Sequence, residues 1–221
     1  MIVIFYFFRQ AAVSVLSRGG VGPSDKFDAM NKTIIMSTCN ENGDLLLPDF
    51  PAKASPVQLI KMAFSNTHNP RYQSNIDSGE VWWTQTTLND KEVFPIIFTS
   101  ETKGFGEIEW KNMGLTDYNI DNNYFYVTFT GPGKVENLKH IIRGDYIKIP
   151  ELGPNEFAMT YIAPLWGAGK NYAALLGETD KIVPVSNLRI HELDYDEENG
   201  PIKLKLKVTI IQILKSQLLM I

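Results

Sequence analysis

Paired carboxylates are the first residues whose type and spacing suggest chemistry, because two acids flanking a sugar can hydrolyse a glycosidic bond. Two groups of closely spaced acids are Glu107 with Glu109, and Asp194, Asp196, Glu197 and Glu198. Glu107 and Glu109 flank Ile108 in an expected strand and share one face of it, as solvated residues do. The second group lies in an acidic hairpin loop, DYDEENG, whose spacing differs from that of a dedicated calcium loop. We therefore predict neither a catalytic pair nor a metal site from these acids.

Nucleophiles and metal ligands are equally sparse. Ser186 and His191, with an Asp nearby, suggest a hydrolytic triad, but no nucleophile-elbow glycines surround this serine. The stretches GPGK (131–134) and GAGK (167–170) lack the spacing of a phosphate-binding loop and are predicted to be turns. Cys39 is the single cysteine, and the three histidines show no metal-ligand spacing. The sequence thus predicts no catalytic residues, no metal and no cofactor.

In contrast to the acids and nucleophiles, the tryptophans of the chain favour a ligand-binding role. The chain has four tryptophans, and Trp82 and Trp83 are adjacent in an expected strand. Neighbouring strand residues point to opposite faces, so one of the two is expected to be exposed. Pyranose rings have apolar faces that stack on aromatic rings. This makes carbohydrate a candidate partner and Trp82 and Trp83 candidate substrate-binding residues, with core packing as the alternative interpretation.

Composition and charge exclude several classes of protein. With 221 residues, of which 44% are hydrophobic, the chain can bury a sizeable core. A formal net charge of -4 argues against nucleic acid as a partner, because phosphate binding needs clustered Lys and Arg. The apolar run at 2–8 ends at Arg9 and is far shorter than the roughly 20 residues of a membrane span, so no membrane is predicted as a partner. The run also lacks the features of a signal peptide. The compartment stays open, with extracellular and lysosomal locations among the alternatives.

The pattern of the chain changes from helical spacing to period-two alternation near residue 80. Residues 26–38 are predicted to form a short helix with Asp25 or Asp28 as its N-cap, and residues 56–64 a second helix. From there, short strands follow at the interval typical of a sandwich or barrel. The strands that we expect are VWWTQTT, VFPIIFTSE, GEIEW, YFYVTFT, DYIKIP, EFAMTYIAP, YAALLG and NLRIHELDY. The sequence therefore predicts a mainly β fold, an antiparallel β-sandwich.

Both ends of the chain look unusual for a free-standing domain. The N-terminal apolar run continues through AAVSVLS and is expected to be a buried strand or helix that a large neighbouring structure covers. Near the other end, residues 202–208 alternate apolar and basic side chains, which predicts a half-exposed strand. The tail 209–221 is almost wholly apolar and has no turn signal. Both termini are therefore interpreted as truncated or mis-joined.

Two stretches of the chain resemble a known enzyme family. The first combines a Gly-Gly turn, a Ser-Asp-Lys sequence and a leucine-rich connector: Gly19, Gly20, Ser24, Asp25, Lys26, Gly43, Leu45 to Leu47, Pro48, Pro51 and Ala52. The second is an LLGE-x-DK phrase: Leu175, Leu176, Gly177, Glu178, Asp180, Lys181, Val183 and Ser186. Together they resemble the end of the catalytic barrel and the last sandwich strands of the α-galactosidase and raffinose-synthase-like glycoside hydrolases.

This resemblance implies a division of the chain and a function. Residues 1–55 would be a short helical remnant of a (β/α) barrel with its connector, residues 56–208 the antiparallel β-sandwich, and residues 209–221 an apolar tail. Family members use two barrel aspartates as nucleophile and acid/base, and both would precede residue 1. The resemblance thus implies a non-catalytic fragment with an apolar interface to a missing barrel, which does not cleave glycosides by itself.

Ser24 and Asp25 are candidate substrate-binding residues under the same resemblance. In the intact family they would lie at the rim of the last barrel strand, where a carboxylate can accept hydrogen bonds from sugar hydroxyls. An Asp that caps the following helix is the alternative interpretation. Two other functions also stay open for the whole chain: a free-standing carbohydrate-binding or interaction module that uses exposed aromatics, and a gene fragment without independent function.

Overall fold

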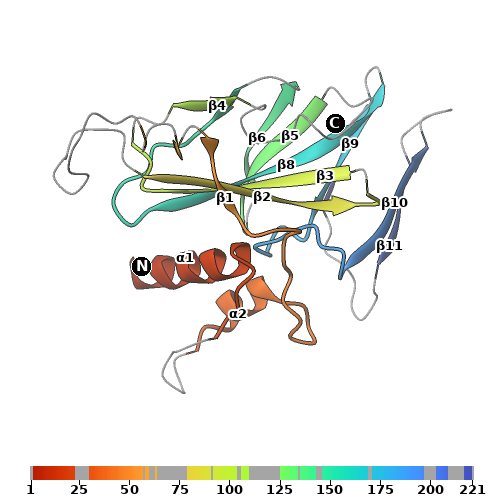
Figure 1. The fold of residues 1–221 in the computed structure, drawn as a ribbon. Coiled ribbons are helices and arrows are strands. Elements are labelled where there is room, and N and C mark those ends of the chain that lie inside the picture. The colour runs from red at the N-terminus through yellow and green to blue at the C-terminus, as the bar shows by residue number, and fades with distance from the viewer. Residues whose placement is uncertain are drawn as a thin grey trace.

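The computed structural model of the chain is drawn as a ribbon in Figure 1. It describes residues 2–22, 30–56, 58–59, 63, 79–90, 92–103, 106–109, 125–133, 135–142, 146–168, 171–196, 203–208 and 217–220. Within these ranges the fold is mainly β, with antiparallel strand pairs throughout and two helices whose bounds are described, which confirms the mainly β part of the prediction. No helix among the described residues is long and apolar enough to span a membrane.

The N-terminal apolar run forms the helix α1 (Ile2–Leu16), which lies along one face of the largest sheet (Figure 1). Its residues Ala12 and Val15 are fully buried against that sheet, whereas Val13 on the other side is 44% exposed. Such one-sided burial follows from apolar residues spaced three and four apart on a helix. Of the two forms predicted for this run, the structure has the helix, and strands of this same chain cover its buried side.

The second helix, α2 (Lys32–Thr38), is shorter than predicted. The side-chain oxygen of Asn31 accepts hydrogen bonds from the backbone N–H groups of Thr33 at 3.0 Å and Ile34 at 3.3 Å. These bonds satisfy N–H groups that have no partner within the helix, so Asn31 is the N-cap. The prediction of Asp25 or Asp28 as the cap of this helix was therefore wrong, and both aspartates lie outside the described residues. In the other predicted helix, 56–64, the described residues are helical.

Eight strands are linked by antiparallel pairing into the largest sheet. The order is β1-β2-β3-β8-β5-β6, and β9 pairs with both β8 and β12. These strands are β1 (Lys53–Ala54), β2 (Glu80–Leu88), β3 (Glu92–Ser100), β5 (Phe125–Gly131), β6 (Glu136–Ile142), β8 (Phe157–Ala168), β9 (Asn171–Gly177) and β12 (Gln217–Met220). Two separate antiparallel pairs accompany it: β4 (Glu107–Glu109) with β7 (Tyr146–Lys148), and β10 (Ile190–Asp196) with β11 (Lys203–Val208).

All eight strands predicted after residue 80 are present, as is the predicted strand near residue 205, which is β11. Three further strands were missed. The residues of β6 from Glu136 to His140 are exposed, so this edge strand lacks an apolar alternation. The short β1 follows a proline-rich connector, and β12 lies in the apolar tail, where it pairs with β9.

The largest sheet is covered on both faces. On β3, Ile96 and Phe98 pack into the apolar cluster that includes α1, while Ile97 points into a second cluster on the opposite side. Ile108 of β4 and Ile147 of β7 belong to that second cluster. Figure 1 shows the result, with α1 on one side of β2 and β3 and β4 on the other. A strand buried on both faces reads as a continuous apolar run, as VFPIIF does.

Candidate functional site

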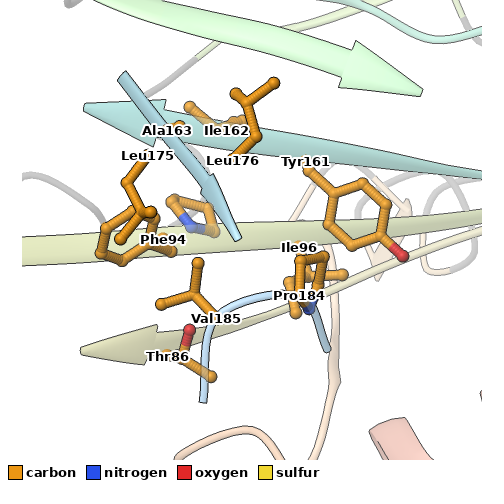
Figure 2. Close-up of a pocket in the computed structure, with 11 residues that line it drawn as sticks. Thr86, Phe94, Ile96, Tyr161, Ile162, Ala163, Leu175, Leu176, Pro184 and Val185 are labelled. Atoms are coloured by element: carbon orange, nitrogen blue, oxygen red, sulfur yellow. The ribbon is translucent and has the colours of Figure 1, made fainter. Parts of the chain in front are cut away.

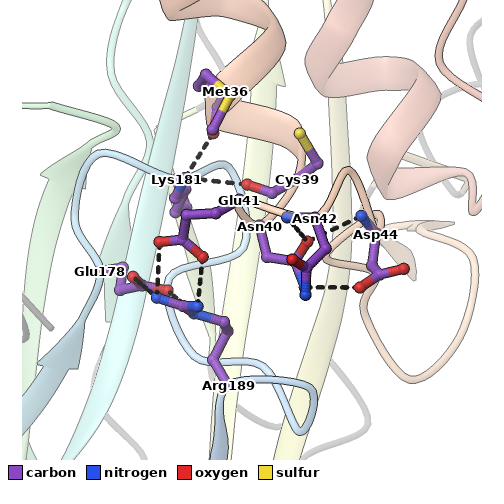
Figure 3. Close-up of polar contacts among 9 residues, drawn as sticks. All are labelled: Met36, Cys39, Asn40, Glu41, Asn42, Asp44, Glu178, Lys181 and Arg189. Carbon is purple, nitrogen blue, oxygen red and sulfur yellow. Dashed lines mark hydrogen bonds and ion pairs between the residues drawn. The ribbon is translucent and has the colours of Figure 1, made fainter. Parts of the chain in front are cut away.

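The most extensive polar arrangement among the described residues joins the segment after β9 to α2 and the turn that follows it. We name it the Arg189 cluster, and it consists of Glu41, Glu178, Lys181 and Arg189 (Figure 3). Arg189 lies between the two carboxylates. Its Nε and Nη2 donate to Glu178 at 3.0 and 2.8 Å, and its Nη1 and Nη2 donate to Glu41 at 2.7 and 3.2 Å. Only 4% of the Arg189 side chain is exposed.

A tight turn after β9 places Glu178 and Lys181. Gly177 has φ +75, and a Cβ at this position would collide with the carbonyl of Pro184, so glycine is required both for the backbone angle and for the close approach. The Glu178 N–H then donates to the Pro184 carbonyl at 2.8 Å, and the Lys181 N–H to the Glu178 carbonyl at 2.9 Å. The LLGE-x-DK phrase therefore forms a compact turn that directs Lys181 toward α2 and Glu178 toward Arg189.

Lys181, which lies outside α2, caps the C-terminus of this helix. Its Nζ donates to the main-chain carbonyls of Met36 at 2.6 Å and Cys39 at 2.9 Å (Figure 3). The backbone N–H of Ile182 adds a bond to the Ser37 carbonyl at 2.9 Å. Carbonyls at a helix C-terminus lack partners within the helix and carry partial negative charge, so a buried ammonium is well suited to them.

A side-chain-stabilised turn presents Glu41 to the cluster. Asn40 Oδ1 accepts from the backbone N–H groups of Asn42 at 3.0 Å and Asp44 at 2.9 Å, and Asn40 Nδ2 donates to the Asp44 carboxylate at 2.9 Å (Figure 3). Asparagine forms such turns readily because its side chain reaches its own backbone two residues on. Glu41, at the second position of the turn, thus reaches Arg189.

The electrostatics of the Arg189 cluster favour the charged forms of Glu41 and Arg189. A hydrogen bond from its own backbone N–H lowers the pKa of Glu41, opposed by partial burial and assisted by Arg189. The hydrogen bond to Glu178 raises the pKa of Arg189, which therefore stays charged. Both carboxylates of the cluster bond to Arg189, so neither is left to act as a nucleophile or general acid. The arrangement can orient two chain segments, and it has no hydrolytic chemistry.

The structure places the predicted aromatic residues as follows. Trp83 is 9% exposed and packs edge-to-face on Phe50, with ring centroids 5.4 Å apart. Trp82 points to the opposite face, as predicted, where it packs half-buried against the cluster that contains α1. Its indole N–H donates to Glu80 at 3.1 Å, and it lines a cavity of about 210 Å³ beside Leu16. Neither tryptophan presents a fully open ring face.

The other predicted residues are not brought into a common site. Ser24 and Asp25 lie outside the described residues. The buried Ser186 accepts a hydrogen bond from the Leu188 N–H at 3.3 Å within a turn, whereas His191 is exposed. Cys39 is buried, and its thiol donates to the Ile35 carbonyl at 3.4 Å. No group of three or more metal-ligating side chains occurs in the part of the chain that the structure describes.

A small pocket between the strands of the sheet has too little volume to be a site. It lies between β3, β8, β9 and the segment at Pro184, and its volume is about 10 Å³, room for one water at most (Figure 2). Tyr161 borders it and donates to the Ile182 carbonyl at 3.0 Å. Complete burial raises the pKa of Tyr161 far above its ordinary value, so its hydroxyl stays protonated. The space belongs to the core.

Sequence reasoning singled out Glu178 and Lys181 for their resemblance to a family phrase and missed Glu41 and Arg189. The Arg189–Glu41 pair spans 148 positions, and no local pattern connects its members. In the sequence, Arg189 stands out only as a single arginine three residues after Ser186. No protein-family model and no curated protein matches this chain.

Proposed function

We propose that this chain is a non-catalytic accessory region of a glycoside hydrolase of the α-galactosidase and raffinose-synthase-like kind. In this proposal the antiparallel strands form a β-sandwich that braces the end of a catalytic barrel. The helices α1 and α2 are then the remnant of that barrel, and the residues that cleave the sugar lie outside this chain.

The contact of Lys181 with the Met36 and Cys39 carbonyls is the observation that supports this proposal most. The two stretches that resemble the family lie more than 120 residues apart in sequence and meet in the fold, because Lys181 of one bonds to the segment that leads into the connector of the other. If the two stretches resembled the family only by chance, the resemblance would not explain why they contact each other. A bracing role, in contrast, requires that the sandwich grip the chain where it leaves the barrel.

The physical character of the Arg189 cluster suits this role. Burying charges costs solvation free energy, so a buried ion pair adds little net stability compared with apolar packing. Its geometry is directional, however, because a guanidinium fork accepts carboxylates in fixed positions. We therefore assign the cluster to orientation: it fixes how the end of the barrel is seated on the sandwich.

The alternative is a free-standing carbohydrate-binding module that uses exposed aromatics. The burial of Trp83 and the packing of Trp82 against α1 make these two residues poor stacking platforms, so this alternative receives less support from the tryptophans than the bracing role receives from Lys181.

Two measurements test the proposal. Aryl α-galactosides and α-glucosides incubated with the purified chain should release no more aryl alcohol than the buffer does, and turnover that tracks the protein through purification would contradict the proposal. Mapping of the transcript upstream of the Met1 codon should reveal an open frame encoding barrel strands that end in two aspartates. A transcript whose frame encodes a different fold there would also contradict it.

A further inference from the structure

A large cavity lined by described residues lies between the β4–β7 pair and strands β5, β6 and β8. Its volume is about 590 Å³, within the range of roughly 300–1,000 Å³ in which proteins hold small molecules. We name it the hairpin cleft. Its lining includes Ile141 and Ile147 of the second apolar cluster, so it lies on the sheet face opposite α1, and no residue of the Arg189 cluster lines it.

The inner part of the hairpin cleft is apolar. Ile141 and Ile147, which are 9% and 3% exposed, contribute to it from opposite sides, and Pro150 and Ala158 complete it. These residues belong to rigid strands or directly follow one. Their positions are fixed by the second apolar cluster, which includes both isoleucines.

The walls carry polar groups of both kinds. Glu107 of β4 lies directly opposite Lys148 of β7, and Thr130 of β5 lies directly opposite Thr160 of β8. None of these four side chains bonds to another residue in the ranges that the structure describes. The cleft therefore offers a carboxylate acceptor, an ammonium donor and two hydroxyls that can act as either. Asn137 and Lys139 of β6 also line it.

An aromatic ring lies at the edge of the same cleft. Tyr146 of β7 is 60% exposed, the largest exposed fraction among the apolar and aromatic side chains that the structure describes. An exposed ring that borders a cavity offers a flat apolar surface to a ligand, and its hydroxyl adds a hydrogen-bonding group.

We propose that the hairpin cleft binds a neutral carbohydrate. A sugar ring combines apolar faces with a rim of hydroxyls, which matches an apolar floor, an exposed tyrosine ring and donors beside acceptors. An anion fits less well because Glu107 stands opposite Lys148 and the other lysine of the lining, Lys139, already has an interaction partner. A purely apolar ligand would leave the polar walls desolvated without partners. This proposal does not depend on the proposed bracing role, because the residues that line the hairpin cleft differ from those of the Arg189 cluster.

The test is isothermal titration of the full chain with raffinose, maltotriose and cellotriose, and with galacturonic acid as an anionic probe. At least one neutral sugar should give saturable heat. Tyr146→Ala should weaken that binding about tenfold, the size expected for loss of one ring contact, and Glu107→Gln should weaken it in the same direction. Thermal melting of each variant identifies any loss of fold.

The matched control is His140→Ala. His140 is exposed and lies on β6 between Lys139 and Ile141, which line the cleft, so it points to the other face of the strand. This variant should bind like the wild type. Absence of saturable heat with every neutral sugar, binding of galacturonic acid alone, or equal losses in Tyr146→Ala and His140→Ala would each overturn the proposal. The bracing role is tested by the separate aryl glycoside assay, so failure of the cleft to bind sugar is distinct from failure of the bracing role.

Discussion

Arg189 and Glu41 form a two-bond ion pair across 148 positions of the chain, with bonds of 2.7 and 3.2 Å. The pair connects the turn after α2 to the segment that enters β10. The interactions within one hairpin cannot make such a connection. The stability of the α2 region therefore depends on residues near the other end of the described fold.

Replacing Arg189 should be strongly destabilising. Arg189→Met leaves Glu178, whose side chain is 8% exposed, without its cation, and breaking a buried pair in this way costs about 3–5 kcal/mol. Urea unfolding monitored by tryptophan fluorescence measures the loss. Glu41→Gln is the matched control, because the Glu41 side chain is 34% exposed and its removal should cost less than about 1 kcal/mol. Equal losses of unfolding free energy in the two variants would contradict the expectation that Arg189 contributes more to stability than Glu41.

Lys181→Met should loosen α2 locally. The methionine keeps most of the apolar stem but leaves the Met36 and Cys39 carbonyls without their donor, at a cost of about 1–3 kcal/mol. Hydrogen–deuterium exchange should show faster exchange in Lys32–Thr38, with β2 and β3 unchanged. The control Lys32→Met alters an exposed lysine of the same helix and should leave exchange as in the wild type. Uniform acceleration across the sheet would show that Lys181 supports the whole fold instead.

Acid should weaken the fold through Glu41. Its pKa is lowered in the folded state, chiefly by the hydrogen bond from its own N–H, so its stabilising contribution is present above the ordinary Glu pKa of 4.5. That contribution is lost as the pH falls through the lower, folded-state pKa. Melting temperatures across about pH 3 to 7 should therefore fall less steeply for Glu41→Gln than for the wild type. Burial raises the pKa of Asp49, which contributes with the opposite sign in both proteins, so the difference between the two curves isolates Glu41. Parallel curves would contradict the assignment.

Two glycines provide a matched test of the turn after β9. Both have positive φ, +75 at Gly177 and +86 at Gly43, but a Cβ at Gly43 meets nothing within 4 Å. Gly43→Ala should cost about 1–2 kcal/mol from the backbone angle alone. Gly177→Ala adds the collision with Pro184 and should cost at least about 1 kcal/mol more in urea unfolding. A smaller loss at Gly177 would mean that the turn can relax.

The strands were predictable because period-two alternation and continuous apolar runs are local signals. VFPIIF identifies a strand buried on both faces, and Trp82 and Trp83 indicate opposite faces by their adjacency alone. The polar edge strand β6 gave no such signal. Asn31 as the N-cap was readable from its residue type, yet Asp25 and Asp28 were equally good caps by that criterion.

The candidate sites were less predictable because they depend on contacts between distant segments. Nothing near Arg189 in the sequence indicates Glu41, and nothing near Tyr146 indicates that Thr130 and Thr160 line the same cavity. Such groupings arise from strand order, in which β8 lies between β3 and β5. Hydrophobic periodicity and β-strand propensity determine which residues form a strand, but not which strands become neighbours in the sheet.

The central place of β8 also governs how this protein can be assembled during synthesis. The β2–β3 and β5–β6 hairpins pair residues close in sequence and can form early, but each then exposes an unpaired edge that only β8 covers. Until the ribosome has delivered residues 157–168, the nascent chain carries two open β edges of high apolar content. Slow translation ahead of β8 would lengthen the time for which these edges are exposed and so favour aggregation over folding.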